Sequence, residues 1–140
     1  MIHNNIALIE QFSAAVSASP RDLEGARRLL HPEFVIREAP SLPFGGDHFG
    51  LEGFLHVMES AGALYEFVRG RENLAPTYLE IDEQTVLMRV ETQARLKATG
   101  KLFPMRVAEF FVFRDELLAE IDVFYWDTAA MSGHSTQAGH

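Results

Sequence analysis

Apolar side chains recur every three or four residues in three separate segments of the chain. The first segment begins near Ile6 and is stopped by Pro20. The same spacing returns at 21–30 and at 50–65. A repeat near 3.6 residues is typical of amphipathic helices. We therefore expect three helices, two of them before residue 31.

Beyond Phe67 the repeat shortens to two residues, which is typical of strands with one buried face. Long strands are predicted at 86–96, 103–114 and 117–126, with a turn around Gly100 and another at Asp115 and Glu116. A short strand is predicted at 34–38, and 67–81 should supply one more, interrupted near Pro76. Between 40 and 46, prolines and glycines predict a turning loop without regular structure. Three helices followed by a strand meander indicate an α+β fold.

The composition fits one globular domain, which we place at 1–128, with a disordered tail at 129–140. The chain has 140 residues, of which 47% are hydrophobic and 11 are Phe, so it can enclose a large apolar interior. The formal charge of −8 argues against nucleic acid, whose phosphates attract basic surfaces. The absence of Cys excludes disulfides and thiol chemistry. Neither a signal peptide nor a membrane span is apparent, so a cytoplasmic protein is expected.

Three stretches carry a family likeness: LLHPEFVIREAP at 29–40, LPFGGDHFG at 42–50 and FRDELLAEIDVFYWD at 113–127. In this order and spacing, over residues 5–128, the chain resembles the nuclear transport factor 2-like (NTF2-like) superfamily, in its SnoaL-like and ketosteroid-isomerase-like branches. The resemblance implies a cone-shaped, cystatin-like α+β fold, in which a curved mixed sheet packs on three N-terminal helices. It also implies a pocket for a small apolar ligand and a homodimer formed through the sheet. Members include isomerases, polyketide cyclases, epoxide hydrolases, dehydratases and non-catalytic binders, so the fold leaves the function open.

Glu38 lies where ketosteroid isomerases keep their carboxylate base, at the end of the first strand and before a proline-containing loop. An apolar pocket would raise the pKa of such a base toward the working range. The oxyanion donors of those isomerases correspond to Phe12 and Arg106. Phe12 cannot donate a hydrogen bond, and Arg106 is a permanent cation that can donate or simply pair with Glu38. Steroid isomerisation is therefore not expected.

Two other branches of the superfamily place their functional residues on the later strands. SnoaL-type polyketide cyclases use a carboxylate on the later strands, for which Asp122 is the candidate, on one strand face with Phe124 and Trp126. Trp126 also matches a pocket-lining aromatic residue of the isomerases. The Asp–Arg–Asp arrangement of the epoxide hydrolases falls on Val90, Thr92 and Phe124, so that reaction is excluded.

The remaining candidates concern the wall of the pocket and bound groups. The expected pocket-lining residues are Phe12, Phe34, Phe54, Met58, Tyr65, Val90, Phe110, Phe124 and Trp126. Glu109 should fall on the opposite sheet face, at a dimer contact. Asp47 and His48 have no matched third ligand, so no metal is expected. The glycines at 45–53 follow no nucleotide-binding pattern, and no cofactor is expected.

Two functions remain open from the sequence. One is cofactor-independent proton transfer in an isomerase, cyclase or dehydratase, with Glu38 as the base and Asp122 or Arg106 assisting. The other is a non-catalytic ligand-binding or interaction module, which the missing oxyanion tyrosine favours. For Glu38 itself, the alternative to a pocket role is a strand-end carboxylate that faces water or pairs with an arginine.

Overall fold

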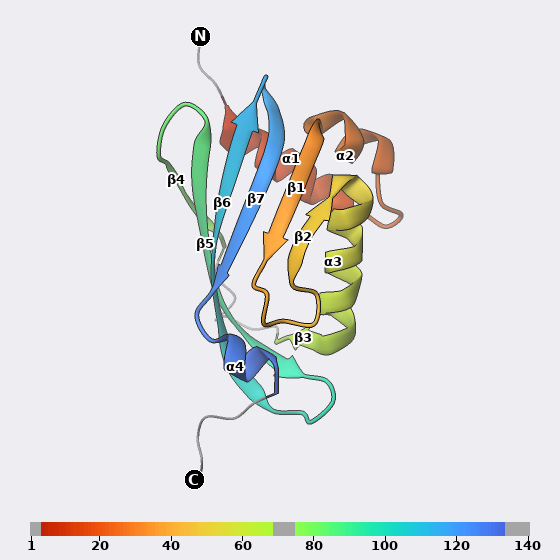
Figure 1. Ribbon diagram of the computed structural model, residues 1–140, viewed down its shortest axis with the longest axis vertical. Helices are drawn as coiled ribbons and strands as arrows, with labels where there is room; N and C mark the ends of the chain where they lie inside the picture. The colour runs from red at the N-terminus through yellow and green to blue at the C-terminus, as the bar shows by residue number, and fades with distance from the viewer. Residues whose placement is uncertain (1–3, 69–74, 134–140) are drawn as a thin grey trace.

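A computed structural model describes residues 4–68 and 75–133 of the chain (Figure 1). The elements, in chain order, are α1 (Asn5–Ser17), α2 (Leu23–Leu29), β1 (Leu30–Glu38), β2 (Gly46–Phe49), α3 (Gly50–Leu64), β3 (Tyr65–Phe67), β4 (Thr77–Glu80), β5 (Thr85–Leu96), β6 (Leu102–Arg114), β7 (Leu117–Tyr125) and α4 (Thr128–Met131). The predicted α+β class is confirmed. In this part of the chain no helix is long and apolar enough to cross a membrane.

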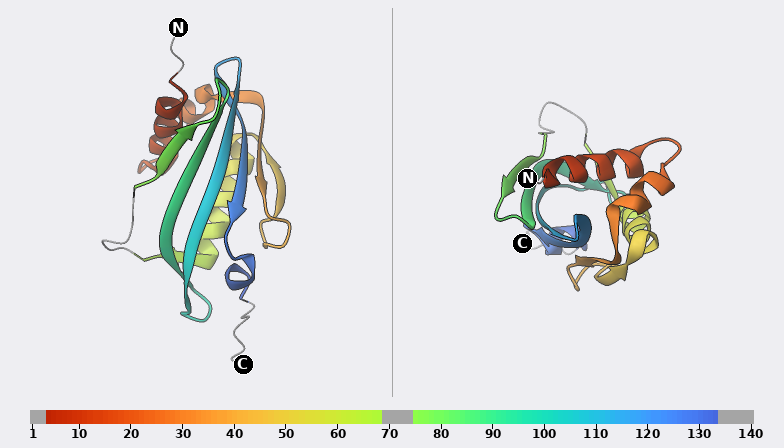
Figure 2. Two further views of the ribbon diagram at one scale, coloured as in Figure 1. Left: turned by 90° about the vertical axis from the view of Figure 1, so that its left-hand side faces the viewer. Right: turned by 90° about the horizontal axis from the view of Figure 1, so that it is seen from above.

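The strands form one mixed sheet in the order β2-β1-β7-β6-β5-β3, with β4 also paired to β5. β1 runs parallel to β7, whereas the other pairs are antiparallel. Seen from above, the sheet curls around an interior, and α1 crosses its open side (Figure 2). The helices and the concave face of the sheet thus enclose the core between them.

Side-chain caps begin two of the helices. Asn4 accepts a hydrogen bond from the Ala7 amide at the start of α1, and Asp22 accepts one from the Gly25 amide at the start of α2. The apolar stripe of α1 then packs into the core, which also holds Phe34 and Ile36 of β1. The largest fully buried side chains are those of Ile9, Phe34, Leu51, Val86, Leu118 and Ile121. This core fixes β1 against the helices and so determines which β1 side chains face inward.

Some boundaries differ from the sequence-based expectation. β2, where no strand was expected, follows the loop expected at 40–46 and shares only Gly46 with it. Its residues Asp47 to Phe49 pair with β1 after Gly46 turns the chain at φ 97°. β1 begins at Leu30, earlier than expected, and passes through Pro32. The segment expected as one interrupted strand forms β3 and β4, on either side of undescribed residues.

The expected disordered tail begins with a described element. Asp127 accepts a hydrogen bond from the Ala130 amide and caps α4. Met131 of this helix is buried in the core. Structure is therefore present at 129–133, and the rest of the expected tail lies outside the described residues.

The hairpin between β6 and β7 has two features that affect the site. Asp115 and Glu116 both adopt positive φ, 54° and 63°, in a two-residue turn without glycine. The β6–β7 register then shifts by one residue, with Ala119 as the extra residue on β7. An extra residue reverses the alternation, so beyond it the odd-numbered side chains of β7 face the interior.

Candidate ligand cavity and its carboxyl groups

A cavity of about 340 Å³ lies between α1, α3 and the concave face of the sheet. Its wall is mostly apolar. The described lining residues are Phe12, Ser13, Val16, Ser17, Ile36, Glu38, Phe54, Val57, Met58, Ala61, Gly62, Phe67, Met88, Glu109, Phe111, Ile121 and Val123. Phe12, Phe54 and Met58 of the expected wall lie in it, with the Phe12 and Phe54 rings 4.8 Å apart, edge to face. Two carboxyl groups interrupt this apolar surface.

Glu38 is the last residue of β1, and it faces inward because Phe34 and Ile36 alternate into the core before it. Only 6% of its surface is exposed. The Tyr125 hydroxyl donates a hydrogen bond to its Oε1 at 2.6 Å. Burial raises the pKa of Glu38 to about 7, although the Tyr125 hydrogen bond and the nearby His48 act in the opposite direction.

Glu109 supplies the second carboxyl group, from β6. It lines the same cavity and pairs in register with Met88 of β5 and Val123 of β7, which also line it. Burial, and then the negative charge of Glu38, raise the pKa of Glu109 to about 7. The side chain is half-buried by surface area. Since it lines the cavity, we attribute that exposed area to the cavity wall rather than to bulk water.

The register of three strands brings the two carboxyl groups to one region. Glu109 lies opposite Val123, while Glu38 follows Arg37, which pairs with the residue before Val123. The two glutamates therefore flank β7, on backbones roughly 10 Å apart at two strand spacings. Two interacting carboxyl groups titrate as a pair. At neutral pH this pair holds on the order of one proton, because both pKa values lie near 7.

Tyr125, on β7, lies beside Glu38 and is packed against the core. Together with Glu38, Pro40 and Asp47 it lines a second pocket of about 570 Å³. Burial and the charge of Glu38 raise the pKa of Tyr125, so its hydroxyl stays protonated and donates. The sequence-based reasoning missed Tyr125 as well as the cavity position of Glu109. The signal that could have found Tyr125 is its odd-numbered position on β7, beyond the extra residue.

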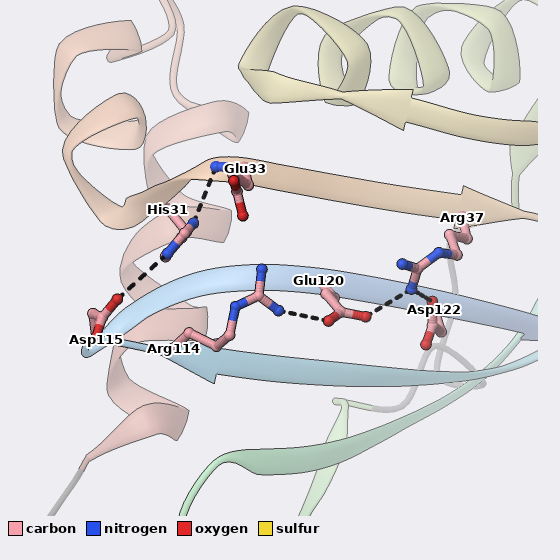
Figure 3. A network of polar contacts seen from close by, with 7 residues as sticks. All are labelled: His31, Glu33, Arg37, Arg114, Asp115, Glu120 and Asp122. Atoms are coloured by element: carbon pink, nitrogen blue, oxygen red, sulfur yellow. Dashed lines mark hydrogen bonds and ion pairs between the residues drawn. The ribbon is translucent and has the colours of Figure 1, made fainter.

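The expected cavity position of Asp122 is wrong. Its carboxylate accepts a hydrogen bond from Arg37 Nη1 at 2.8 Å on the outer face of the sheet, and Arg37 also contacts Glu120 at 2.7 Å (Figure 3). Arg114 bonds the other oxygen of Glu120 at 2.7 Å, so the four side chains form a chain across β6, β7 and β1. The extra residue Ala119 is the cause, since it turns the even-numbered residues of β7 outward.

Arg106 is also on the outer face and pairs with neither Glu38 nor Glu109. Its guanidinium lies 4.6 Å from the centre of the Trp126 ring, and its Nε is 3.8 Å from Glu91. On β6 the inward residues are the odd-numbered ones, such as Glu109, so the alignment that placed Arg106 in the pocket is wrong by one residue.

Four further expected wall residues are also absent from the described lining of the cavity. Phe110 packs edge to face on Phe124 at 5.7 Å, and Phe124 and Trp126 are 57% and 66% exposed. Val90, Phe124 and Trp126 line a shallow outer groove of about 240 Å³ rather than the cavity. Their expected place in the pocket wall is therefore wrong.

Two further expected wall residues lie in the core. Tyr65 is buried, and its hydroxyl donates to the Met131 carbonyl oxygen at 2.8 Å. Phe34 packs against Phe12 at 6.5 Å behind the cavity wall. Neither of the two is among the described residues that line the cavity.

The histidines of this region form no metal-binding cluster within the described residues. The rings of His48 and His56 lie 5.5 Å apart, and His48 Nε2 is 2.8 Å from the Phe44 carbonyl oxygen. No group of three or more potential ligands is present in 4–68 and 75–133.

A curved mixed sheet, closed by helices around an apolar cavity, defines a protein of the NTF2-like class. Residues 9–121 match the family model of the SnoaL-like domain. This match spans most of the chain, and the chain therefore belongs to the SnoaL-like domain family of the NTF2-like superfamily. None of the curated proteins matches its sequence.

Solved structures share the fold at low sequence identity. An NTF2-like protein from Burkholderia xenovorans LB400 is 18% identical with a TM-score of 0.78, over 94% of this chain and 95% of that chain. A protein of cystatin-like fold from Xanthomonas campestris is 16% identical with a TM-score of 0.67, over 94% and 97%. TerC, co-crystallised with polyporic acid, is 18% identical with a TM-score of 0.66, over 90% and 93%. At these identities the likeness shows the fold alone.

Proposed function

We propose that the protein binds a small, largely apolar molecule in the cavity and that Glu38 transfers a proton on that molecule. The observation that carries this proposal is the Glu38 carboxyl group, which is 6% exposed, has a raised pKa of about 7 and lies in an apolar wall. A base with a pKa near the working pH is both ionised and basic enough to accept a proton. TerC, a structural relative, was co-crystallised with a small molecule, polyporic acid.

The proposed step requires only groups of this chain. Ionised Glu38 removes a proton from an acidic carbon of the bound molecule, and the O–H bond formed at the carboxyl group replaces the broken C–H bond. The Tyr125 hydroxyl holds the Oε1 side of the carboxylate, which orients the other oxygen. Return of the proton to a different atom gives isomerisation, and loss of a leaving group gives dehydration.

Hydrogen–deuterium exchange of a carbon acid tests this step without a known substrate. The probe is 2-tetralone, a compact apolar ketone, incubated in D2O and followed by ¹H NMR. The wild type should accelerate exchange at the carbon next to the carbonyl group, Glu38→Gln should not, and Asp122→Asn on the outer face should behave as the wild type. Equal exchange rates with the wild type and Glu38→Gln would overturn the proton-transfer proposal.

A binding module without catalysis is the second candidate. It is favoured by Phe12, which occupies the position expected for an oxyanion donor and cannot donate, and by the Tyr125 hydroxyl, which already donates to Glu38. This candidate predicts that 2-tetralone binds, with chemical-shift changes at the cavity residues, but that its exchange rate equals that in buffer.

We also propose a homodimer that covers the outer face of the sheet. Phe124 and Trp126 are more than half exposed there, beside the Arg106 and Glu91 pair. Large exposed apolar side chains of this kind, rimmed by charges, are typical of interfaces. Sedimentation equilibrium at micromolar concentration should give twice the monomer mass, and Trp126→Glu should give the monomer mass. A monomeric wild type would refute the dimer.

A further inference from the structure

We infer that the cavity selects molecules in which a positively charged nitrogen, an ammonium or a protonated imine, is attached to an apolar body. This inference deepens the proposed function and rests on its first part, that the cavity binds a small molecule. It does not rest on the occurrence of proton transfer.

The charges of the cavity are all of one sign. Among the described lining residues, Glu38 and Glu109 are the only ones that ionise, and no lysine, arginine or histidine is present. The arginines of the neighbouring strands point to the other face. Arg37 binds Glu120 and Asp122, and Arg106 lies near Glu91. The two carboxyl groups therefore have no arginine or lysine counterion in the described structure, although the charge of His48, which lies outside the lining, lowers the pKa of Glu38.

The oxygen atoms of both groups are also short of donors. Glu38 is more than nine-tenths buried, and its Oε1 accepts from Tyr125, but no described residue donates a hydrogen bond to its Oε2. The carboxyl group of Glu109 makes no hydrogen bond or ion pair with any described residue. Buried carboxylates are normally paired with a cation or with several donors, because they are otherwise costly to ionise. That cost is visible as the raised pKa of both groups.

A cationic nitrogen supplies what the cavity lacks. Its N–H groups would donate to the free carboxylate oxygens, and its charge would interact with both glutamates beside an apolar wall, where screening is weaker than in bulk water. The edge-to-face rings of Phe12 and Phe54 offer apolar surface to the rest of the molecule and an aromatic face to a cation. A neutral ligand would leave one carboxylate unpaired, and an anionic ligand would add a further negative charge beside it.

A cationic ligand also suits a site in which Phe12 occupies the position expected for an oxyanion donor. A carbon next to a carbonyl group becomes more acidic when a donor binds the oxygen, whereas a carbon next to a protonated imine is acidified by the charge of the ligand itself. The absence of a tyrosine hydroxyl at the Phe12 position would then be no obstacle to proton removal by Glu38.

Three ligands with one skeleton test the inference: 2-aminotetralin, 2-tetralol and tetralin-2-carboxylate. By isothermal titration calorimetry at pH 7, the amine should bind at least about tenfold more tightly than the alcohol. This is the gain expected for hydrogen bonds to a charged group. The carboxylate should bind least. At pH 5 both glutamates are protonated and the advantage of the amine should fall. Titrations in two buffers of different ionisation enthalpy should show proton release with the amine and none with the alcohol.

Variants and controls complete the test. Glu109→Gln should reduce the amine-to-alcohol affinity ratio severalfold, while Glu80→Gln, an exposed residue of β4, should leave the ratio as in the wild type. Proton release is measured on the wild type, so it decides the matter even if a variant fails to fold. Equal binding of amine and alcohol, or amine binding without proton release, overturns this inference and leaves the proposed function standing. If none of the three ligands binds, the binding half of the proposed function falls with it.

Discussion

Replacement of Glu109 by glutamine should change how the stability of the protein depends on pH. Glu109 lies in the cavity wall, and its pKa is raised from 4.5 to about 7, first by burial and then by the charge of Glu38. The folded protein thus holds this proton more tightly than the unfolded chain does. The group therefore adds stability at low pH, and this contribution is lost as the pH rises through 7.

The magnitude follows from the two pKa values. A rise from 4.5 to about 7 corresponds to about 3 kcal/mol of free energy of unfolding. About 2.5 kcal/mol of this is lost between pH 5 and pH 8, because the unfolded chain is already largely ionised at pH 5. Glu109→Gln removes this contribution. The amide brings a cost of its own, but that cost is the same at both pH values.

Urea unfolding followed by circular dichroism at pH 5 and pH 8 measures the effect. Between pH 5 and pH 8, the free energy of unfolding of the variant should rise by about 2.5 kcal/mol relative to that of the wild type, whatever the difference between the two proteins at pH 5. Glu80→Gln, exposed on β4, serves as the control and should follow the wild type at both pH values. If wild type and Glu109→Gln change in parallel, Glu109 does not hold a proton in the folded cavity, and the account of the site as a coupled carboxyl pair fails.

Three further outcomes are expected. Tyr125→Phe removes the hydrogen bond that lowers the pKa of Glu38, so the Glu38 titration followed by ¹³C NMR should move above pH 7; a downward shift would contradict the 2.6 Å contact. Glu116→Gly should stabilise the protein by about 1 kcal/mol in thermal unfolding, since φ is 63° there and glycine adopts such angles freely; a lower melting temperature would count against this. Gly45→Ala should lower the melting temperature because its Cβ would lie 2.4 Å from a backbone carbonyl oxygen, whereas Gly62→Ala in α3 meets nothing within 4 Å and should raise it. Equal effects of the two alanines would exclude the steric explanation.

The fold could be predicted from the sequence because its signals are local. The apolar repeat changes from helical to alternating after α3, and turn residues separate the long strands β5, β6 and β7. The position of Glu38 could be predicted for the same reason, since the core residues Phe34 and Ile36 fix the inward face of β1 and Pro40 lies just after its end.

The polar part of the site depends on strand pairing, which no local pattern specifies. One extra residue, Ala119, reverses the faces of β7, so Asp122 lies outside the barrel and Tyr125 reaches Glu38. On β6 an alignment error of one residue placed Arg106 in the cavity. The inward face of that strand carries Glu109 instead. A shift of one residue moves every side chain to the other face of a strand. The carboxyl groups of the cavity could therefore be assigned only once the register was known.

The parallel pairing of β1 with β7 has a consequence for the order of folding. Arg37 and Glu120 lie 83 positions apart in the sequence, so the strand that ends in Glu38 finds its partner only after nearly the whole chain is available. Closure of such a long loop is entropically unfavourable, and non-local strand pairs of this kind slow folding. On a ribosome the helices and β5–β6 can form first, but the cavity floor must wait for β7. Chains that end before β7 would lack Tyr125 and the support for β1, and would have no assembled site.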